Sequence, residues 1–144
     1  MIPILVSCNP KSPLEDYNYS EDFNVYFSNT FETVLQDQAI KHLFVVPLSS
    51  CTPCVEATLS FFIEFSGKDV GIITCGLPDN ENTLNYIKTI STLENVWMDN
   101  DGDISKYRTN IGAPYYLAVN EGKIRKGLEL DNKKIELIRP LFLK

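Results

Sequence analysis

The sequence predicts a single α/β domain, a three-layer sandwich with a mixed but mostly parallel central sheet and helices on both faces. Apolar runs typical of buried strands alternate with stretches whose apolar residues repeat at helical spacing, and this alternation requires crossovers between parallel strands. Near the C-terminus, two strand-like segments flank a short glycine-containing turn, which indicates a β-hairpin followed by a helix. The chain has 144 residues, 44% of them hydrophobic, which is enough for one packed core.

The first half of the chain contains two predicted helices and two predicted strands. Residues 29–39 have the composition and spacing of a helix. Residues 42–48 form a compact apolar run, most like a buried parallel strand. Residues 52–65 carry apolar side chains on one helical face and are followed by Gly67, a helix stop. Residues 69–75 predict a second buried strand.

The second half continues the alternation and ends in the hairpin and its following helix. The predicted elements are a helix over 80–91, a strand over 95–98, a short helix around 104–108, hairpin strands over 115–119 and 124–128, and a last helix that Asp131 caps and Pro140 ends or kinks.

Charge and composition exclude several classes of protein. A formal net charge of −6 argues against nucleic-acid binding, which needs a basic surface to displace counterions. No run approaches the roughly 18 apolar residues of a membrane span. Four cysteines are too few for a disulfide-rich scaffold.

The N-terminal segment ILVSC, residues 4–8, has the shape of a bacterial lipoprotein cleavage box, in which Cys8 would be lipidated. No basic segment precedes it, and it stands too near the printed start for a secretory signal. A start further upstream and a plain frayed terminus with a free cysteine both remain open. The polar, proline-containing stretch that follows predicts a tether, so we expect a lipobox-like segment and tether over 1–22 and the folded domain over 23–144.

The motif SSCTPC places Cys51 and Cys54 between a predicted strand and a predicted helix. At a helix N-terminus, unpaired backbone N–H groups and the helix dipole favour a thiolate, and the pKa of a cysteine falls from about 8.5 to roughly 3.5–7.5. Cys54 lies one turn later, within reach of the first sulfur, and Pro53 fits a first turn that needs no amide donor. We therefore predict a pair in which Cys51 attacks a substrate disulfide and Cys54 resolves the mixed disulfide.

Two structural interpretations of the pair are weaker. A structural zinc site needs four ligands, and the remaining Cys8, Cys75 and His42 form no second close pair. A purely structural bridge across so short a loop would remove little chain entropy. Redox exchange without a metal or other cofactor is therefore favoured. Cys75 itself stands in an apolar strand, as a buried small hydrophobe or a third redox thiol.

The segment NIGAPYYLAV, residues 110–119, supports the redox interpretation. A proline at the start of a strand invites a cis peptide bond, here between Ala113 and Pro114. Opposite the cysteines, such a bond would leave the Ala113 backbone free to pair with an extended substrate. The predicted substrate-contacting residues are Thr52, Pro53, Ala113 and Pro114. Tyr115 and Tyr116 are expected as core or rim aromatics, one of which is a candidate to line the substrate groove.

The segment DNDGD, residues 99–103, faintly resembles a calcium loop. It lacks the distal glutamate at the twelfth position, where Asn110 stands. We therefore expect a turn that leads into a helix.

CTPC after a strand, followed by SKYRTNIGAPYYLAVNEGKI, resembles the thioredoxin-like fold, with its C-x-P-C motif, cis-proline before a strand and glycine-containing hairpin. The additional strand–helix unit before VWMDNDG is more similar to the extracytoplasmic TlpA/ResA thiol-disulfide reductases and their AhpC/TSA relatives. The resemblance covers roughly residues 28–142. It implies that Cys51 is the nucleophile, Cys54 the resolving thiol and Pro114 the cis-proline.

The sequence departs from that pattern at several positions. Ser50 replaces the tryptophan that usually precedes the first cysteine, and Val45 stands where thioredoxin carries a buried acid. Glu56, directly after Val55, is the nearest carboxylate in the motif's helix and is expected as an exposed helix residue. A peroxiredoxin is disfavoured because Leu48 occupies the place of its threonine.

The resemblance implies a thiol-disulfide oxidoreductase. More specifically, it implies a disulfide reductase that acts on extracytoplasmic protein substrates and draws electrons from an upstream thiol donor. We expect a monomer in the periplasm or cell envelope, with a possible membrane tether through lipidated Cys8. The alternative is a non-catalytic thioredoxin-like binding module whose cysteines form a static disulfide.

Overall fold

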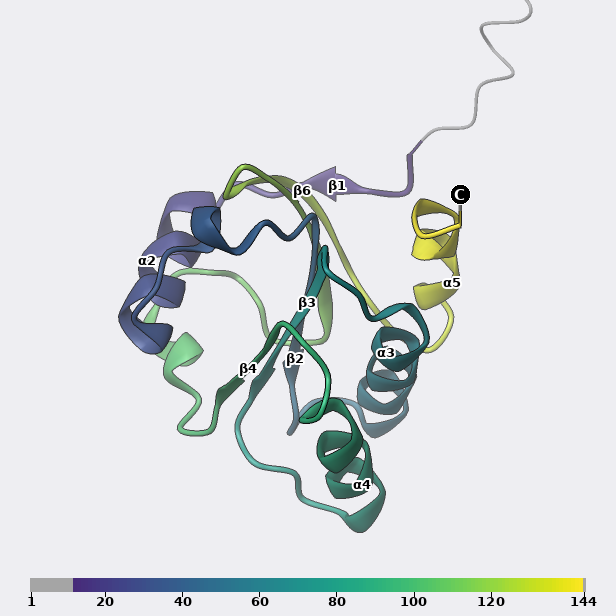
Figure 1. Ribbon diagram of the computed structural model, residues 1–144. Helices are drawn as coiled ribbons and strands as arrows, with labels where there is room; N and C mark the ends of the chain where they lie inside the picture. The colour runs from purple at the N-terminus through teal and green to yellow at the C-terminus, as the bar shows by residue number, and fades with distance from the viewer. Residues whose placement is uncertain (1–11, 144) are drawn as a thin grey trace, which may run out of the picture.

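The computed structural model describes residues 12–143, and Cys8 with its cleavage-box-like segment lies outside them. The elements are β1 (Glu15–Asp16), α2 (Ser20–Phe31), β2 (His42–Pro47), α3 (Thr52–Phe65), β3 (Val70–Cys75), α4 (Glu81–Ile90), β4 (Val96–Asp99), β5 (Tyr115–Asn120), β6 (Lys123–Glu129) and α5 (Ile135–Ile138), with short 3₁₀ helices η1 (Leu35–Gln38), η2 (Asp103–Lys106) and η3 (Arg139–Leu141). The strands form one sheet in the order β1-β6-β5-β2-β3-β4 (Figure 1). The expected α/β class with a mixed sheet is confirmed.

The sheet carries less parallel pairing than predicted. The pairs β2–β3 and β3–β4 are parallel, whereas β2–β5, β5–β6 and β1–β6 are antiparallel. The expectation of a mostly parallel sheet is therefore wrong. The crossover helices α3 and α4 produce the two parallel pairs, while the hairpin joins β2 in the opposite direction and β1 extends it at the outer edge.

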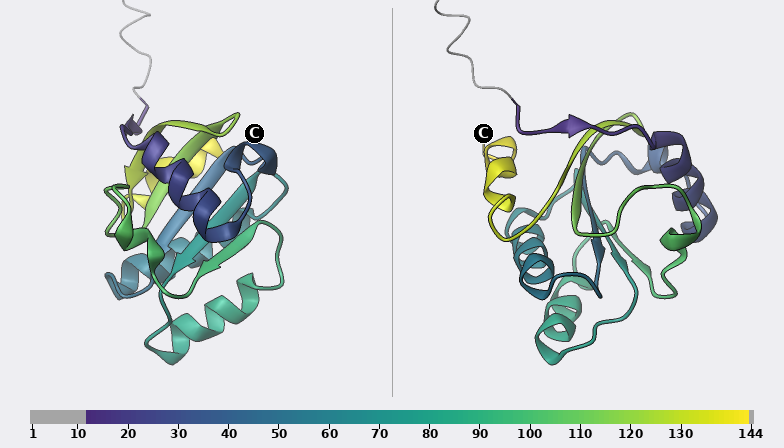
Figure 2. Two further views of the ribbon diagram at one scale, coloured as in Figure 1. Left: turned by 90° about the vertical axis from the view of Figure 1, so that its left-hand side faces the viewer. Right: turned by 180° about the vertical axis from the view of Figure 1, so that it is seen from behind.

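Helices cover the sheet on both faces. Helix α2 lies on one face, and α3, α4 and α5 lie on the other (Figures 1 and 2). The side chains of β2 alternate between these layers: Phe44 and Val46 belong to the core under α3, and Leu43 and Val45 to the core under α2. A strand buried on both faces is apolar throughout, which explains why its sequence shows a continuous apolar run.

The N-terminal part of the domain differs from the prediction. The helix expected over 29–39 instead begins at Ser20, because Phe23, Tyr26 and Phe27 form its fully buried stripe at helical spacing. Glu32 ends it in a left-handed backbone conformation, with φ of 56°. The remainder of the expected helix holds only the short η1.

The expected tether is also shorter than residues 1–22. Glu15–Asp16 pairs with Lys126 and Gly127 of β6, and the next residue, Tyr17, is buried and donates its hydroxyl to the carbonyl of Thr109 at 2.6 Å. Residues 15–22 therefore belong to the folded domain and not to a tether. Within residues 12–143, no helix combines the length and the hydropathy needed to cross a membrane.

Candidate active site

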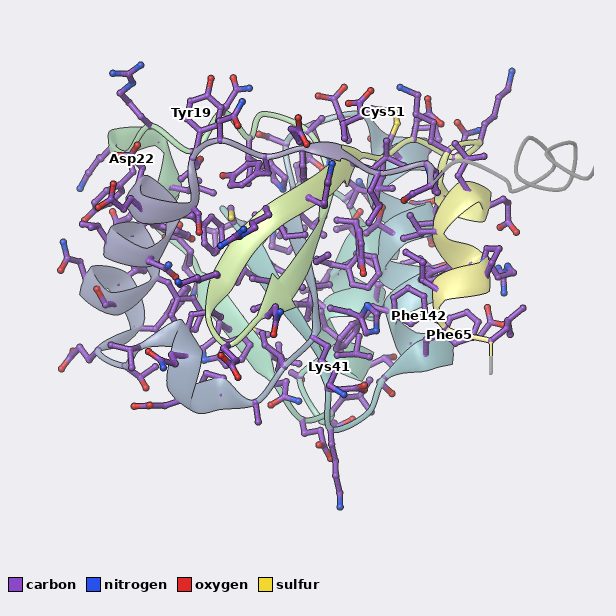
Figure 3. All side chains as sticks on the ribbon, turned by 90° about the horizontal axis from the view of Figure 1, so that it is seen from above. Tyr19, Asp22, Lys41, Cys51, Phe65 and Phe142 are labelled. Carbon is purple, nitrogen blue, oxygen red and sulfur yellow. A yellow bond between two sulfur atoms is a disulfide. The ribbon has the colours of Figure 1, made fainter. Side chains whose placement is uncertain are left out.

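The CTPC motif lies where β2 passes into α3. The chain leaves β2 at Pro47 and turns, with the Ser50 backbone and hydroxyl both donating to the Pro47 carbonyl at 3.2 and 2.6 Å. Cys51 follows directly and is the N-cap residue of α3. Figure 3 shows Cys51 and Lys41 at opposite ends of the sheet, since Lys41 immediately precedes β2. The site therefore occupies the carboxyl end of a central parallel strand.

Cys51 and Cys54 form a disulfide, with their Cα atoms 5.2 Å apart, within the usual range for such bonds. The Cys51 Sγ also accepts a hydrogen bond from the backbone N–H of Cys54 at 3.4 Å. This donor is one of the orphan N–H groups of the helix N-terminus, so it faces any charge that forms on the sulfur. The prediction that the two sulfurs lie within bonding distance across one helical turn is thus confirmed.

The two sulfurs differ in access. Cys51 is exposed, whereas Cys54 is 7% exposed and packs at the start of the helix's buried face. Thr52 and Pro53 are exposed beside Cys51, with Pro53 in the first turn of α3 as predicted. A reagent from solvent therefore reaches Cys51 first, and Cys54 is placed to react only with its neighbour.

The Ala113–Pro114 bond lies beside the carboxyl end of β2, near Cys51, but is trans. Tyr115 pairs with Val45, so Pro114 stands beside the end of β2, close to where Cys51 follows. All peptide bonds in residues 12–143 are trans, so the expected cis bond is wrong. Gly112 and Ala113 already bend the chain before the strand, and the trans form is favoured by roughly 0.5–1 kcal/mol when no contact demands the other.

Pro114 is held in place by its backbone. Its side chain is buried, and its carbonyl accepts a hydrogen bond from the Leu130 N–H at 2.8 Å. Ala113 is half-buried at the bend. The structure thus brings the predicted substrate-contacting residues together beside the carboxyl end of β2. Thr52 and Pro53 begin α3 directly after that strand, and Ala113 and Pro114 directly precede β5, its neighbour in the sheet.

A buried polar network lies under α2, beside the same ends of β3 and β4. The Tyr26 hydroxyl donates to Asp99 Oδ2 at 2.8 Å and lies 3.9 Å from the Cys75 sulfur. Asp99 also accepts from the backbone N–H groups of Asp103 and Ile104, at 2.8 and 3.0 Å. The expectation that DNDGD leads into a helix is confirmed, because Asp99 binds the first turn of η2. Among residues 12–143, no group of three or more acidic, His or Cys side chains is arranged to hold a metal ion.

Cys75 is confirmed as a buried residue and should be an unreactive thiol. Burial raises the pKa of Cys75 to about 12, despite a hydrogen bond with Tyr26 that acts in the opposite direction. Since the thiolate is the reactive species, Cys75 should react with an aromatic disulfide reagent at pH 8 at least about a hundredfold more slowly in the folded protein than in urea. The measurement uses Cys8→Ser protein with the Cys51–Cys54 disulfide intact. Equal rates in the two conditions would show that this thiol is accessible.

Leu77 lies at the same end of the strands as Cys51, and no sequence pattern predicts it as a residue of the candidate site. It is 67% exposed in the loop after β3. That loop begins beside the end of β2, because the Leu48 N–H donates to the carbonyl of Cys75, the last residue of β3. A single leucine in a loop has no pattern that would distinguish it from any other exposed side chain.

The candidate site is thus an exposed Cys51, a covered Cys54 and a proline bend that leads into the neighbouring strand β5. A comparison of the chain with protein-family models found no match, and a search of curated proteins found none either.

Proposed function

We propose that the protein catalyses thiol–disulfide exchange, with Cys51 as nucleophile and Cys54 as resolving thiol. The observation that carries the proposal is the asymmetry of the pair: an exposed sulfur at a helix N-terminus, bridged to a covered sulfur one turn later. Exchange proceeds by thiolate attack on a disulfide sulfur, so it needs an accessible thiol, and a second thiol within reach resolves the mixed disulfide that forms.

The proposed reaction begins with the reduced pair. The Cys51 thiolate attacks one sulfur of a substrate disulfide, and the other substrate sulfur leaves as a thiolate that takes up a proton. Cys54, as a thiolate, then attacks Cys51 Sγ, which forms the intramolecular disulfide and releases the second substrate thiol. The substrate gains two electrons and the protein loses two, so a dithiol donor must reduce the pair before the next cycle.

The proposal includes a thioredoxin-like fold of the TlpA/ResA kind. It is supported by the β2–α3–β3 crossover, which carries the C-x-x-C motif at its first junction, and by the hairpin β5–β6 that follows Pro114. We further propose protein disulfides outside the cytoplasm as substrates. The lipid anchor at Cys8 is the part of this proposal that rests on the cleavage-box-like sequence alone.

A redox titration tests the proposal. The full chain is equilibrated in thiol/disulfide buffers, and the Cys51–Cys54 pair is followed by alkylation and mass spectrometry. We expect a two-electron transition within the span of about −120 to −270 mV that known exchangers cover. A pair that stays oxidised below about −300 mV would instead be a static disulfide, and the protein would then be the non-catalytic binding module.

A further inference from the structure

A cleft of about 650 Å³ opens at the same end of the central strands as Cys51. Its lining includes Gly112 and Tyr115, the two residues that flank the Ala113–Pro114 pair, and it extends across the end of β6 to β1. Neighbouring strands lie about 4.8 Å apart, so β6 lies about 10 Å from β2, the length of about three extended residues. A peptide whose cysteine reacts at Cys51 can therefore place a nearby side chain in this cleft.

An aromatic ring lies within the cleft because one residue of β6 has no side chain. A Cβ atom on Gly127 would lie 2.8 Å from Cε1 of Tyr115 and 2.7 Å from the carbonyl oxygen of Tyr116. The Tyr115 ring therefore covers Gly127, and it is held on one side by the ring of Tyr17, at 5.9 Å between centroids. Of the two adjacent tyrosines, Tyr115 lines a groove and Tyr116 belongs to the core.

Two carboxylates flank this ring. In the sheet, Glu15 of β1 pairs with Gly127, and Glu129 of β6 pairs with Tyr115. Both glutamates are exposed and line the cleft. Burial raises the pKa of Tyr115, and the negative charges of Glu15 and Glu129 raise it further, as expected for carboxylates close to the phenol.

Neither carboxylate forms an ion pair within the described part of the chain. No ion pair shorter than 4 Å joins Glu15 or Glu129 to a basic group of residues 12–143. Lys134 also lines the cleft, where it competes with any incoming cation. An aromatic face between two unpaired carboxylates is a favourable environment for a guanidinium or ammonium group, because ring and carboxylates both attract positive charge.

We propose that this cleft binds an arginine or lysine side chain of the substrate protein, about three residues from the cysteine that reacts with Cys51. The position of that cysteine rests on the proposed exchange activity, whereas binding of the cation rests on the cleft alone. The site would select, among proteins with accessible disulfides, those with a basic residue next to the reacting sulfur.

The test compares two synthetic peptides. Each carries a cysteine in a mixed disulfide with a chromogenic aromatic thiol, and three residues away either arginine or its neutral analogue citrulline. The second-order rate constant for reaction with the reduced full-length protein is measured at low and high ionic strength. We expect the arginine peptide to react roughly 3- to 10-fold faster at low salt, with the difference falling as salt rises. A ratio of one at low salt overturns the inference.

Matched variants separate the cleft from the general negative charge of the protein. Glu15→Gln combined with Glu129→Gln should bring the ratio close to one. Glu32→Gln combined with Glu94→Gln changes the formal charge of −6 by the same two units at exposed positions outside the cleft, and should keep the ratio. Lys134→Gln removes the competing cation and should raise it. Equal loss in both double variants would overturn the inference, because the preference would then come from net charge.

A binding measurement keeps this inference distinct from the exchange activity. If neither peptide reacts, the proposed function fails, and the cleft is tested with Cys51→Ser/Cys54→Ser protein and a labelled arginine peptide that contains no cysteine. Fluorescence anisotropy should show tighter binding than for the citrulline peptide, and Glu15→Gln combined with Glu129→Gln should abolish the difference. Equal affinities for both peptides would overturn the assignment of the cleft.

Discussion

Cys51→Ser is expected to abolish disulfide reduction. The serine hydroxyl is not ionised at neutral pH and does not attack a disulfide sulfur. The remaining sulfur of the pair, on Cys54, is only 7% exposed and does not replace it. With insulin as substrate and a dithiol as electron donor, the rate should fall to the uncatalysed background, a loss of about a thousandfold or more of the kind seen when an enzyme loses its nucleophile. Unchanged activity would remove Cys51 from this role.

Cys54→Ser should separate the two halves of the reaction. The exposed Cys51 still attacks, but no thiol remains one turn away to release the product, so a mixed disulfide between protein and substrate should accumulate on non-reducing gels. Cys75→Ala is the matched control, since it removes a buried thiol that stands outside the pair and should leave turnover near that of the unaltered protein. Accumulation in Cys51→Ser and not in Cys54→Ser would reverse the two roles.

The central part of the fold could be predicted because its signals are local. The helix expected over 52–65 has the bounds of α3, and the strands expected over 42–48 and 69–75 differ from β2 and β3 by one residue. Each is defined by its own apolar pattern, either continuous or at helical spacing. The position of the cysteine pair follows from the same elements, because it stands at the junction between two of them.

The N-terminal part could not be predicted in the same way. The two-residue strand Glu15–Asp16 exists only through its pairing with β6, more than 100 residues later, and leaves no pattern of its own. The stripe of Phe23, Tyr26 and Phe27 begins directly after a polar stretch with two prolines, which resembles a tether when it is considered without its partner strands. Without β1, the sequence also does not indicate the antiparallel pairing of β1 with β6 at this side of the sheet.

The cleft beside the candidate active site shows the same limit. Its two carboxylates lie on different strands and come together only because β1 pairs with β6 at Gly127. The Tyr115 ring lies between them because Gly127 has no side chain. In the sequence, only the tyrosine pair after Pro114 indicates a groove at this place. Conversely, the proline motif predicted a cis bond that the bend at Gly112 and Ala113 makes unnecessary.

Asp99→Ala is expected to cause a large loss of stability. Asp99 is 2% exposed and accepts three hydrogen bonds, from the Tyr26 hydroxyl and from the N–H groups of Asp103 and Ile104. Alanine removes all three acceptor contacts at once and leaves donors without partners, each at a cost of about 1–3 kcal/mol when buried. We expect the free energy of unfolding, measured in urea at neutral pH, to fall by about 3 kcal/mol or more.

Two variants show whether the network or the acidic turn is responsible for that loss. Asp101→Ala removes an exposed carboxylate from the same turn and should change the free energy of unfolding by no more than about 0.5 kcal/mol. Tyr26→Phe removes one of the three donors and leaves Asp99 with the other two, so its cost should lie between the two aspartate variants, near 1 kcal/mol. If Asp99→Ala proves no more destabilising than Asp101→Ala, the network does not hold η2 in place, and the chain that leads from η2 to the proline bend must be positioned by other contacts.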